Sequence, residues 1–228
     1  MSAVLAAGRF SLLNLVLFAT AACAASRHHQ ELQFHVRSDC RAVRVCFESI
    51  QSALDAAARI DSVRWLNIDI GPGDYYEKIT VQRGRTRLSG HVPKRTRIHF
   101  DAVAQTAGQY HRANWGTPGS ATLTINADEV TVEGIAVENT YDYLSNDALP
   151  EGDAKKIANS QAVALLLDVA SDRVYVDRAK LVGYQDTLFT NGKRALIRRS
   201  SIAGNVDFIF GNGQLLIEDS EIRSRTRK

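Results

Sequence analysis

The chain has 228 residues, of which 45% are hydrophobic, and a formal net charge of +3. This length and apolar content suit one globular domain with a sizeable core. The near balance of charge, with no long block of Lys or Arg, argues against a nucleic-acid-binding protein, so we expect no nucleic-acid partner.

The first thirty residues have the pattern of an export signal. Arg9 precedes an apolar run over residues 10–22, and Ala22-Cys23-Ala24 fits a small-residue cleavage site. The run is shorter than a membrane span requires. We therefore predict a signal peptide over residues 1–25, a secreted protein and no transmembrane span. Two alternatives stay open: a lipoprotein of the outer membrane with its lipid on Cys23, and a buried N-terminal helix.

Cys40 and Cys46 follow the predicted signal peptide. Neighbouring thiols in an exported protein usually pair, so we predict a disulfide between them, with two free cysteines as the alternative. Two cysteines with no histidine at ligand spacing make a poor zinc site. We therefore expect no metal there.

Secondary-structure signals change once along the chain. Apolar residues at helical spacing predict a helix over Phe47 to Ile60, which would cap the N-terminal end of a sheet-rich body. From Trp65 onward, short β-rich runs are separated by Gly, Asn, Asp and Pro. The clearest of these predicted strands are Leu66–Ile70, Leu123–Ile125 and Val130–Val132.

The C-terminal half repeats one pattern, in which an apolar anchor precedes four mostly polar residues and another apolar residue. The anchors Val176, Ile197 and Ile217 are 21 and 20 residues apart, and an earlier copy at Val132 lies 44 residues before Val176, close to two further periods. A period of about twenty residues is typical of a β-solenoid. A leucine-rich repeat has a similar period but needs regular leucines. We predict an all-β fold, a right-handed parallel β-helix over residues 26–228.

Tyr141 to Ser160 interrupts this rhythm with polar and charged residues, Pro150 and Gly152. We interpret it as a loop that projects from the solenoid. Such insertions often build one wall of a binding cleft, and a plain surface loop is the alternative.

Two acids are the strongest candidates for chemistry. Asp186 and Asp207 are 21 residues apart, which is one coil, so the repeat predicts that they face the same way from adjacent strands. Like charges that close cannot both ionise cheaply, so one pKa should rise, giving an acid beside an anion. The alternative is two solvent-facing turn residues. Their apolar neighbours, such as Leu188 and Phe208, favour a functional pair.

Neutral amides and aromatic residues accompany the acids. Gln185 and Gln161 can stabilise a developing oxyanion without titrating, although surface amides are commoner. Tyr184, Phe189 and Phe210 suit a floor on which a sugar stacks, or else fill the core.

Four segments, in order, resemble signatures of the pectin methylesterase family: Gly73–Glu77, Gln161–Leu165, Gly183–Leu188 and Val206–Gly211. Together they are highly specific, and the resemblance covers the chain from about Trp65 to Lys228. The long loop and the Gly116-Thr117 turn resemble the Gram-negative bacterial branch.

This resemblance implies a hydrolase that removes methyl esters from pectin. It gives Asp207 the role of nucleophile and Asp186 that of acid and then base. Gln185 and Gln161 match amides at the oxyanion and the substrate. The remaining matches are substrate contacts: Val206 and Phe210 to the ester or sugar, and Thr117 and Arg227 to the polymer, where an Arg suits a uronate carboxylate. The implied reaction needs no metal or cofactor, and we expect a monomer.

The sequence also departs from the family. A further downstream motif, Leu-Gly-Arg-Pro-Trp, is absent from these 228 residues. We therefore expect a C-terminally truncated or degenerate copy with strongly reduced activity. Two rival functions follow: a β-helix that only binds polysaccharide, and a β-helical glycoside hydrolase, since two carboxylates about 5 Å apart also suit a retaining glycosidase.

Overall fold

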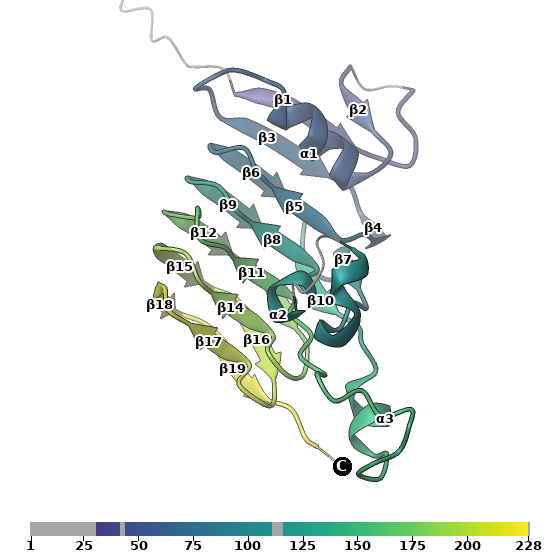
Figure 1. Ribbon diagram of the computed structural model, residues 1–228. Coiled ribbons are helices and arrows are strands. Elements are labelled where there is room, and N and C mark those ends of the chain that lie inside the picture. The colour runs from purple at the N-terminus through teal and green to yellow at the C-terminus, as the bar shows by residue number, and fades with distance from the viewer. Residues whose placement is uncertain (1–30, 42–43, 111–115, 228) are drawn as a thin grey trace, which may run out of the picture. The chain divides into compact units, whose positions relative to one another are not determined.

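The computed structural model describes residues 31–41, 44–110 and 116–227 (Figure 1). The predicted signal peptide and Cys23 lie outside these residues. The strands from β1 onward form three parallel sheets. Among the described residues, no helix is both long enough and apolar enough to span a bilayer.

Sheet A has eight strands in the spatial order β18-β15-β12-β9-β6-β3-β1-β2. Their bounds are β1 Leu32–Val36, β2 Cys46–Phe47, β3 Leu66–Ile70, β6 Thr86–Ser89, β9 Val130–Glu133, β12 Val174–Asp177, β15 Arg194–Arg198 and β18 Gln214–Glu218.

Sheet B has six strands in the order β19-β16-β13-β10-β7-β4. Their bounds are β4 Gly73–Tyr76, β7 Thr96–Phe100, β10 Ala136–Asn139, β13 Lys180–Val182, β16 Ser201–Gly204 and β19 Glu221–Ser224. Sheet C has five strands in the order β17-β14-β11-β8-β5. Their bounds are β5 Ile79–Val81, β8 Leu123–Ile125, β11 Leu165–Leu167, β14 Leu188–Thr190 and β17 Ile209–Gly211.

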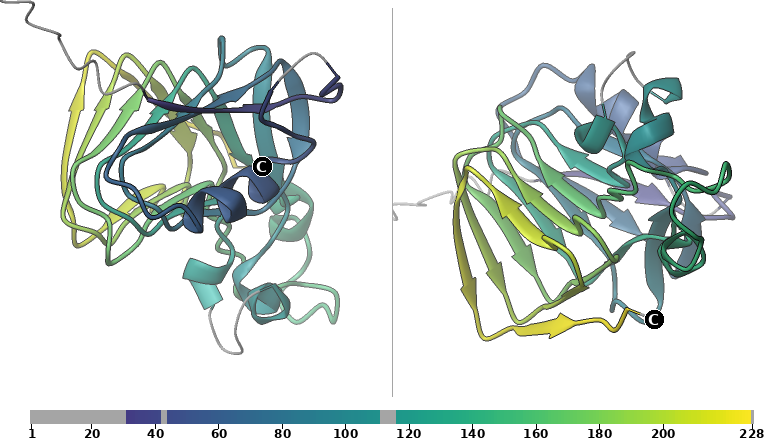
Figure 2. Two further views of the ribbon diagram at one scale, coloured as in Figure 1. Left: turned by 90° about the horizontal axis from the view of Figure 1, so that it is seen from above. Right: turned by 60° about the horizontal axis from the view of Figure 1, so that its bottom comes forward.

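From β3 onward the chain runs from sheet A to sheet B to sheet C and back to A, so each circuit is one coil of a parallel β-helix (Figure 2). The predicted fold is confirmed at this level. One inward-facing apolar ladder in sheet A runs through every coil, and its members belong to the same core: Phe34, Ile68, Leu88, Val132, Val176, Ile197 and Ile217. Two predicted strands, Leu66–Ile70 and Leu123–Ile125, have the predicted bounds.

The interval from Val132 to Val176 is one coil and not two, because these residues are direct partners in sheet A. The prediction of two periods was wrong since the loop over 141–160, with helix α3 (Tyr143–Asp147), lengthens the connection from β10 to β11. The preceding coil is lengthened in the same way between β7 and β8 by η1 (Ala104–Gln109) and α2 (Gly116–Gly119). Both excursions therefore leave the coil where sheet B passes to sheet C, which we call the B–C corner.

The corners reuse one backbone conformation. Among the residues that the structure describes, eight other than glycine have a positive φ, and they fall at equivalent positions of successive coils. These are Arg85, Glu129 and Arg173 where sheet C passes to sheet A, Arg178, Arg199 and Asp219 where A passes to B, and Asp186 and Asp207 at the B–C corner. Such residues are uncommon. At the first two corners their side chains form ion pairs between coils, such as Arg85–Glu129 and Arg198–Asp219.

Helix α1 spans Ile50–Ala58, which is shorter than the predicted 47–60. It begins later because Phe47 pairs with Val36 in sheet A, and Ser49 then accepts a hydrogen bond from the Ser52 backbone N–H as the N-cap. The buried face of α1 packs into the main core. A disulfide joins Cys40 and Cys46, whose Cα atoms are 5.4 Å apart.

Candidate active site

Asp186 and Asp207 lie at the B–C corner, each two residues before a strand of sheet C. Because Leu188 pairs with Ile209, the two acids occupy equivalent positions of adjacent coils. The Asp186 backbone N–H also donates to the Val206 carbonyl at 3.0 Å. Adjacent strands are about 4.8 Å apart, so the two carboxyl groups extend from neighbouring coils at the same corner.

Both acids have the left-handed backbone conformation, with φ of 64° for Asp186 and 45° for Asp207. Asp is, after Gly and Asn, among the residues that occur most often in this region. The same conformation recurs at the other corners, so here it belongs to the turn between sheets B and C that presents both acids. The stacked coils on either side hold that turn in place.

The environments of the two acids differ. Asp186 is 6% exposed, whereas Asp207 is exposed. Burial, and then the charge on Asp207, raise the pKa of Asp186 from its ordinary 3.8 to about 7. Within the described ranges, neither carboxyl group accepts a hydrogen bond from protein. Their oxygens are therefore available to a ligand, and the buried one holds its proton up to near-neutral pH.

The two predicted amides lie beside the acids. Gln185 directly precedes Asp186, and its side-chain Oε1 accepts a hydrogen bond from Ser160 Oγ at 2.9 Å. Gln161 belongs to the preceding coil, where the Ala162 backbone N–H donates to the Gln185 carbonyl at 3.2 Å. The carbonyl oxygen of Gln161 accepts from Ala104 N–H at 2.8 Å. Both amides therefore stand at the B–C corner.

The aromatic residues divide into two groups. Phe189 and Phe210 stack with ring centroids 4.3 Å apart, and both are half-buried on strands that follow the acids. Tyr184 instead stacks on Tyr143 at 5.4 Å and lies under the Arg225 guanidinium, 3.6 Å from its ring centroid. The phenylalanine pair can therefore face a ligand, whereas Tyr184 is engaged with protein.

Of the other predicted contacts, Val206 directly precedes Asp207, whereas Thr117 and Arg227 lie in segments outside the repeating strands. Val206 meets Asp186 through its backbone carbonyl. Thr117 is in α2, and Ser120, which directly follows this helix, accepts at Oγ a hydrogen bond from Val163 N–H at 3.0 Å. Arg227 pairs with Asp147 of α3 at 2.6 Å and so ties the C-terminal segment to the long loop.

Sequence reasoning missed the residues that support the amides. Ser160 contacts Gln185, and Arg225 contacts the neighbouring Tyr184. Gln105 of η1 accepts hydrogen bonds from the backbone N–H groups of Ala158 and Asn159, which precede Ser160. The only available signal was that Ser160 adjoins Gln161 in sequence.

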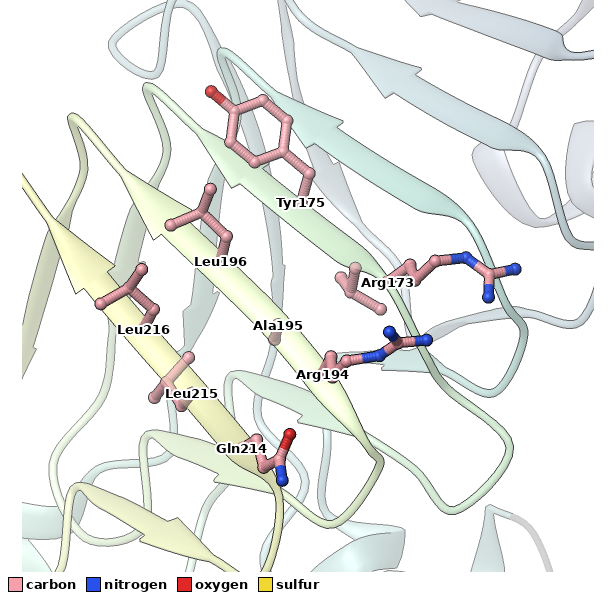
Figure 3. A pocket seen from close by; sticks show the side chains of 9 residues that line it. Arg173, Tyr175, Arg194, Ala195, Leu196, Gln214, Leu215 and Leu216 are labelled. Carbon is pink, nitrogen blue, oxygen red and sulfur yellow. The ribbon is translucent and has the colours of Figure 1, made fainter.

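A hollow of about 540 Å³ lies on sheet A and not at the B–C corner (Figure 3). Its floor is a row of apolar side chains that includes Tyr175, Leu196 and Leu216. The guanidinium groups of Arg173 and Arg194 at its edge already pair with acids. Its lining contains no carboxylate, imidazole, amine or thiol, unlike the corner that carries the two acids. In the part of the chain that the structure describes, no three His, Cys, Asp or Glu gather as metal ligands would.

Comparison with known proteins points in one direction. A family model described as Pectinesterase matches residues 36–228. Pectinesterase A of Dickeya dadantii (strain 3937) is 37% identical over 183 residues, covering 79% of this chain and 49% of that protein. A solved pectin methylesterase from Erwinia chrysanthemi is 32% identical with a TM-score of 0.76, covering 86% of this chain and 56% of that one. A carrot pectin methylesterase is 25% identical with a TM-score of 0.67. The chain spans about half the length of the curated relatives it matches.

Proposed function

The chain belongs to the pectinesterase family, and from this we propose that it hydrolyses the methyl esters of pectin, releasing methanol and leaving pectate. The observation that carries the proposal is the unequal acid pair. A buried Asp186 with a pKa of about 7 stands one coil from an exposed Asp207, with two amides at the same corner. A nucleophile, a proton donor and oxyanion donors are what acyl transfer requires.

In the proposed mechanism the Asp207 carboxylate attacks the ester carbonyl carbon, and the carbonyl electrons move onto its oxygen. Side-chain N–H groups of Gln185 and Gln161 stabilise this oxyanion. When the oxyanion collapses, the bond to the methoxy group breaks and protonated Asp186 donates its proton, so methanol leaves and an acyl-enzyme anhydride remains. Asp186 then takes a proton from water. The resulting hydroxide attacks the anhydride, which frees the acid product and Asp207.

We also propose which residues contact the polymer. We assign Val206 and Phe210 to the methyl ester or sugar, and Thr117 and Arg227 to the polymer. Arg227 would exchange Asp147 for a uronate carboxylate, because the guanidinium that pairs with the Asp147 carboxylate can pair with another carboxylate in the same way. No cofactor enters the mechanism.

Three further assignments belong to the same proposal. Residues 1–25 are a signal peptide and the protein is secreted as a monomer, with a lipid on Cys23 as the alternative. Residues 26–228 form the β-helix domain, with coils of right-handed sense. Helix α1 closes its N-terminal end, a role supported by its packing with β1, β2, β3 and β5.

The test compares methanol and reducing ends released from highly methylated polygalacturonate. We expect methanol without new reducing ends, and loss of that methanol in Asp207→Asn and Asp186→Asn. Reducing ends in proportion to activity would favour a glycoside hydrolase. Retained binding of the polymer, with no methanol from the unmodified chain, would favour a binding protein.

A further inference from the structure

One hydrogen bond reaches the proposed oxyanion site from outside the repeating coils. Ser160, the last residue of the 141–160 loop, donates from Oγ to Gln185 Oε1 at 2.9 Å. Gln185 is half-buried, and its Nε2 has no hydrogen-bond partner among the described residues. The carbonyl end of this amide is therefore held by protein while the donor end is left for a ligand.

The backbone around Ser160 is itself pinned by η1. Gln105 N–H donates to the Asn159 carbonyl at 3.1 Å. In return, Gln105 Oε1 accepts from the N–H groups of Ala158 and Asn159 at 2.9 and 3.3 Å. On the other side, Ala104 N–H donates to the Gln161 carbonyl at 2.8 Å. Residues 158–161 are thus fixed on both sides of Ser160, independently of Gln185.

A buried clamp fixes the same segment from within the loop. Asn146 Nδ2 donates to the Ile157 carbonyl at 3.0 Å, and Asn146 Oδ1 accepts from Ile157 N–H at 2.7 Å. Asn146 is buried. The hydroxyl of Ser160 therefore meets Gln185 from a rigid support, as a preorganised site requires.

The orientation of the Gln185 amide decides whether it stabilises an oxyanion. An amide that turns Nε2 to the oxyanion stabilises it, whereas one that turns Oε1 to it repels the developing charge. A hydroxyl that donates to Oε1 fixes the carbonyl end away from the reacting oxygen. It also polarises the amide, so the N–H groups become better donors.

We infer that Ser160 is a positioning residue for the reaction, holding Gln185 with its N–H groups toward the oxyanion. This inference rests on the proposed function. It assigns part of the 141–160 loop to catalysis: the loop end presents Ser160 to one amide and continues directly into the other, Gln161.

The test is a double-mutant cycle on methanol release. We expect Ser160→Ala to lower kcat about tenfold with KM nearly unchanged, because one neutral hydrogen bond that orients the donor is lost. Gln185→Ala should lower kcat about a hundredfold or more. In the Gln185→Ala background, Ser160→Ala should cost nothing further, because its effect passes through the amide. Ser160→Thr keeps the hydroxyl and should restore the rate.

The matched control is Ser145→Ala, an exposed serine of the same loop, which should behave as the unmodified protein. Equal kcat for Ser160→Ala and the unmodified protein, or losses that add with Gln185→Ala, would overturn the inference. Failure of the unmodified chain to release methanol would instead overturn the proposed function. In that case side-chain amide NMR decides: the Gln185 signals, assigned by their loss in Gln185→Ala, should shift in Ser160→Ala and not in Ser145→Ala. Unshifted signals would refute the contact.

Discussion

Replacing Asp186 by Asn should stabilise the protein at alkaline pH and leave its stability unchanged at acid pH. In the folded protein, burial and the charge on Asp207 raise the Asp186 pKa to about 7, whereas the ordinary value, expected in the unfolded chain, is 3.8. The protonated form therefore favours folding. As pH rises from about 4 to about 7, the unfolded chain gives up this proton before the folded one, and the folded state loses stability. Asn carries no such proton.

The size of this loss follows from the difference of about 3 between the two pKa values. Each pKa unit is worth about 1.4 kcal/mol, which gives about 4 kcal/mol as an upper limit. Asp207 is exposed, so water screens its charge and reduces the effect. We therefore expect the advantage of Asp186→Asn over the unmodified protein to grow by about 2 to 4 kcal/mol between pH 4 and pH 8.

The measurement is urea-induced unfolding of both proteins at pH 4 and pH 8. Other titrating groups, such as Asp172 with its arginine partner, are common to both proteins and cancel in the difference. Asp207→Asn is the control. It removes only the charge, which is the smaller cause, so its gain at pH 8 should be smaller than that of Asp186→Asn. A stability difference that is the same at both pH values would refute the reasoning.

Three other outcomes are expected. Enzymatic methanol release should fall as pH rises above about 7, because Asp186 must hold a proton to give to methanol, and a rate still rising at pH 9 would contradict this role. Glu77→Ala should lower the free energy of unfolding in urea by about 1–2 kcal/mol, since that carboxylate accepts both first N–H groups of α1, and an unchanged midpoint would argue against the cap. Arg225→Ala should speed tryptic cleavage within the 141–160 loop, because Arg225 holds Tyr184, and Tyr184 stacks on Tyr143 of that loop. Equal cleavage rates would show that the loop is held by other contacts.

The sequence predicted those parts of the structure that repeat from coil to coil. In the last three coils, apolar anchors at a period of about twenty residues identified the stacked strands, and the same period placed Asp186 and Asp207 in register. Those coils have short corners, so sequence spacing and spatial spacing agree. The spacing failed between Val132 and Val176 because the excursion adds length to one coil without adding a rung.

Contacts made by the excursions could not be predicted in the same way. The bond from Ser160 to Gln185 depends on Gln105, which lies in a segment with no repeating partner. The pairing of Arg227 with Asp147 joins residues 80 apart through two irregular segments. Neither follows from periodicity, because each is set by the path of a loop. The start of α1 was misjudged for a related reason, since Phe47 has a parallel partner in Val36 that local helical spacing does not reveal.

Both long excursions leave the solenoid at one corner, in the two coils directly before those that carry the acids. The strands on either side keep their registers despite the added length, as the pairing of β9 with both β6 and β12 demonstrates. Growth or exchange of these segments therefore remodels the approach to the acids while the scaffold that aligns them stays the same. Insertions at this corner can therefore diversify what the protein binds without altering the residues proposed to carry out the reaction.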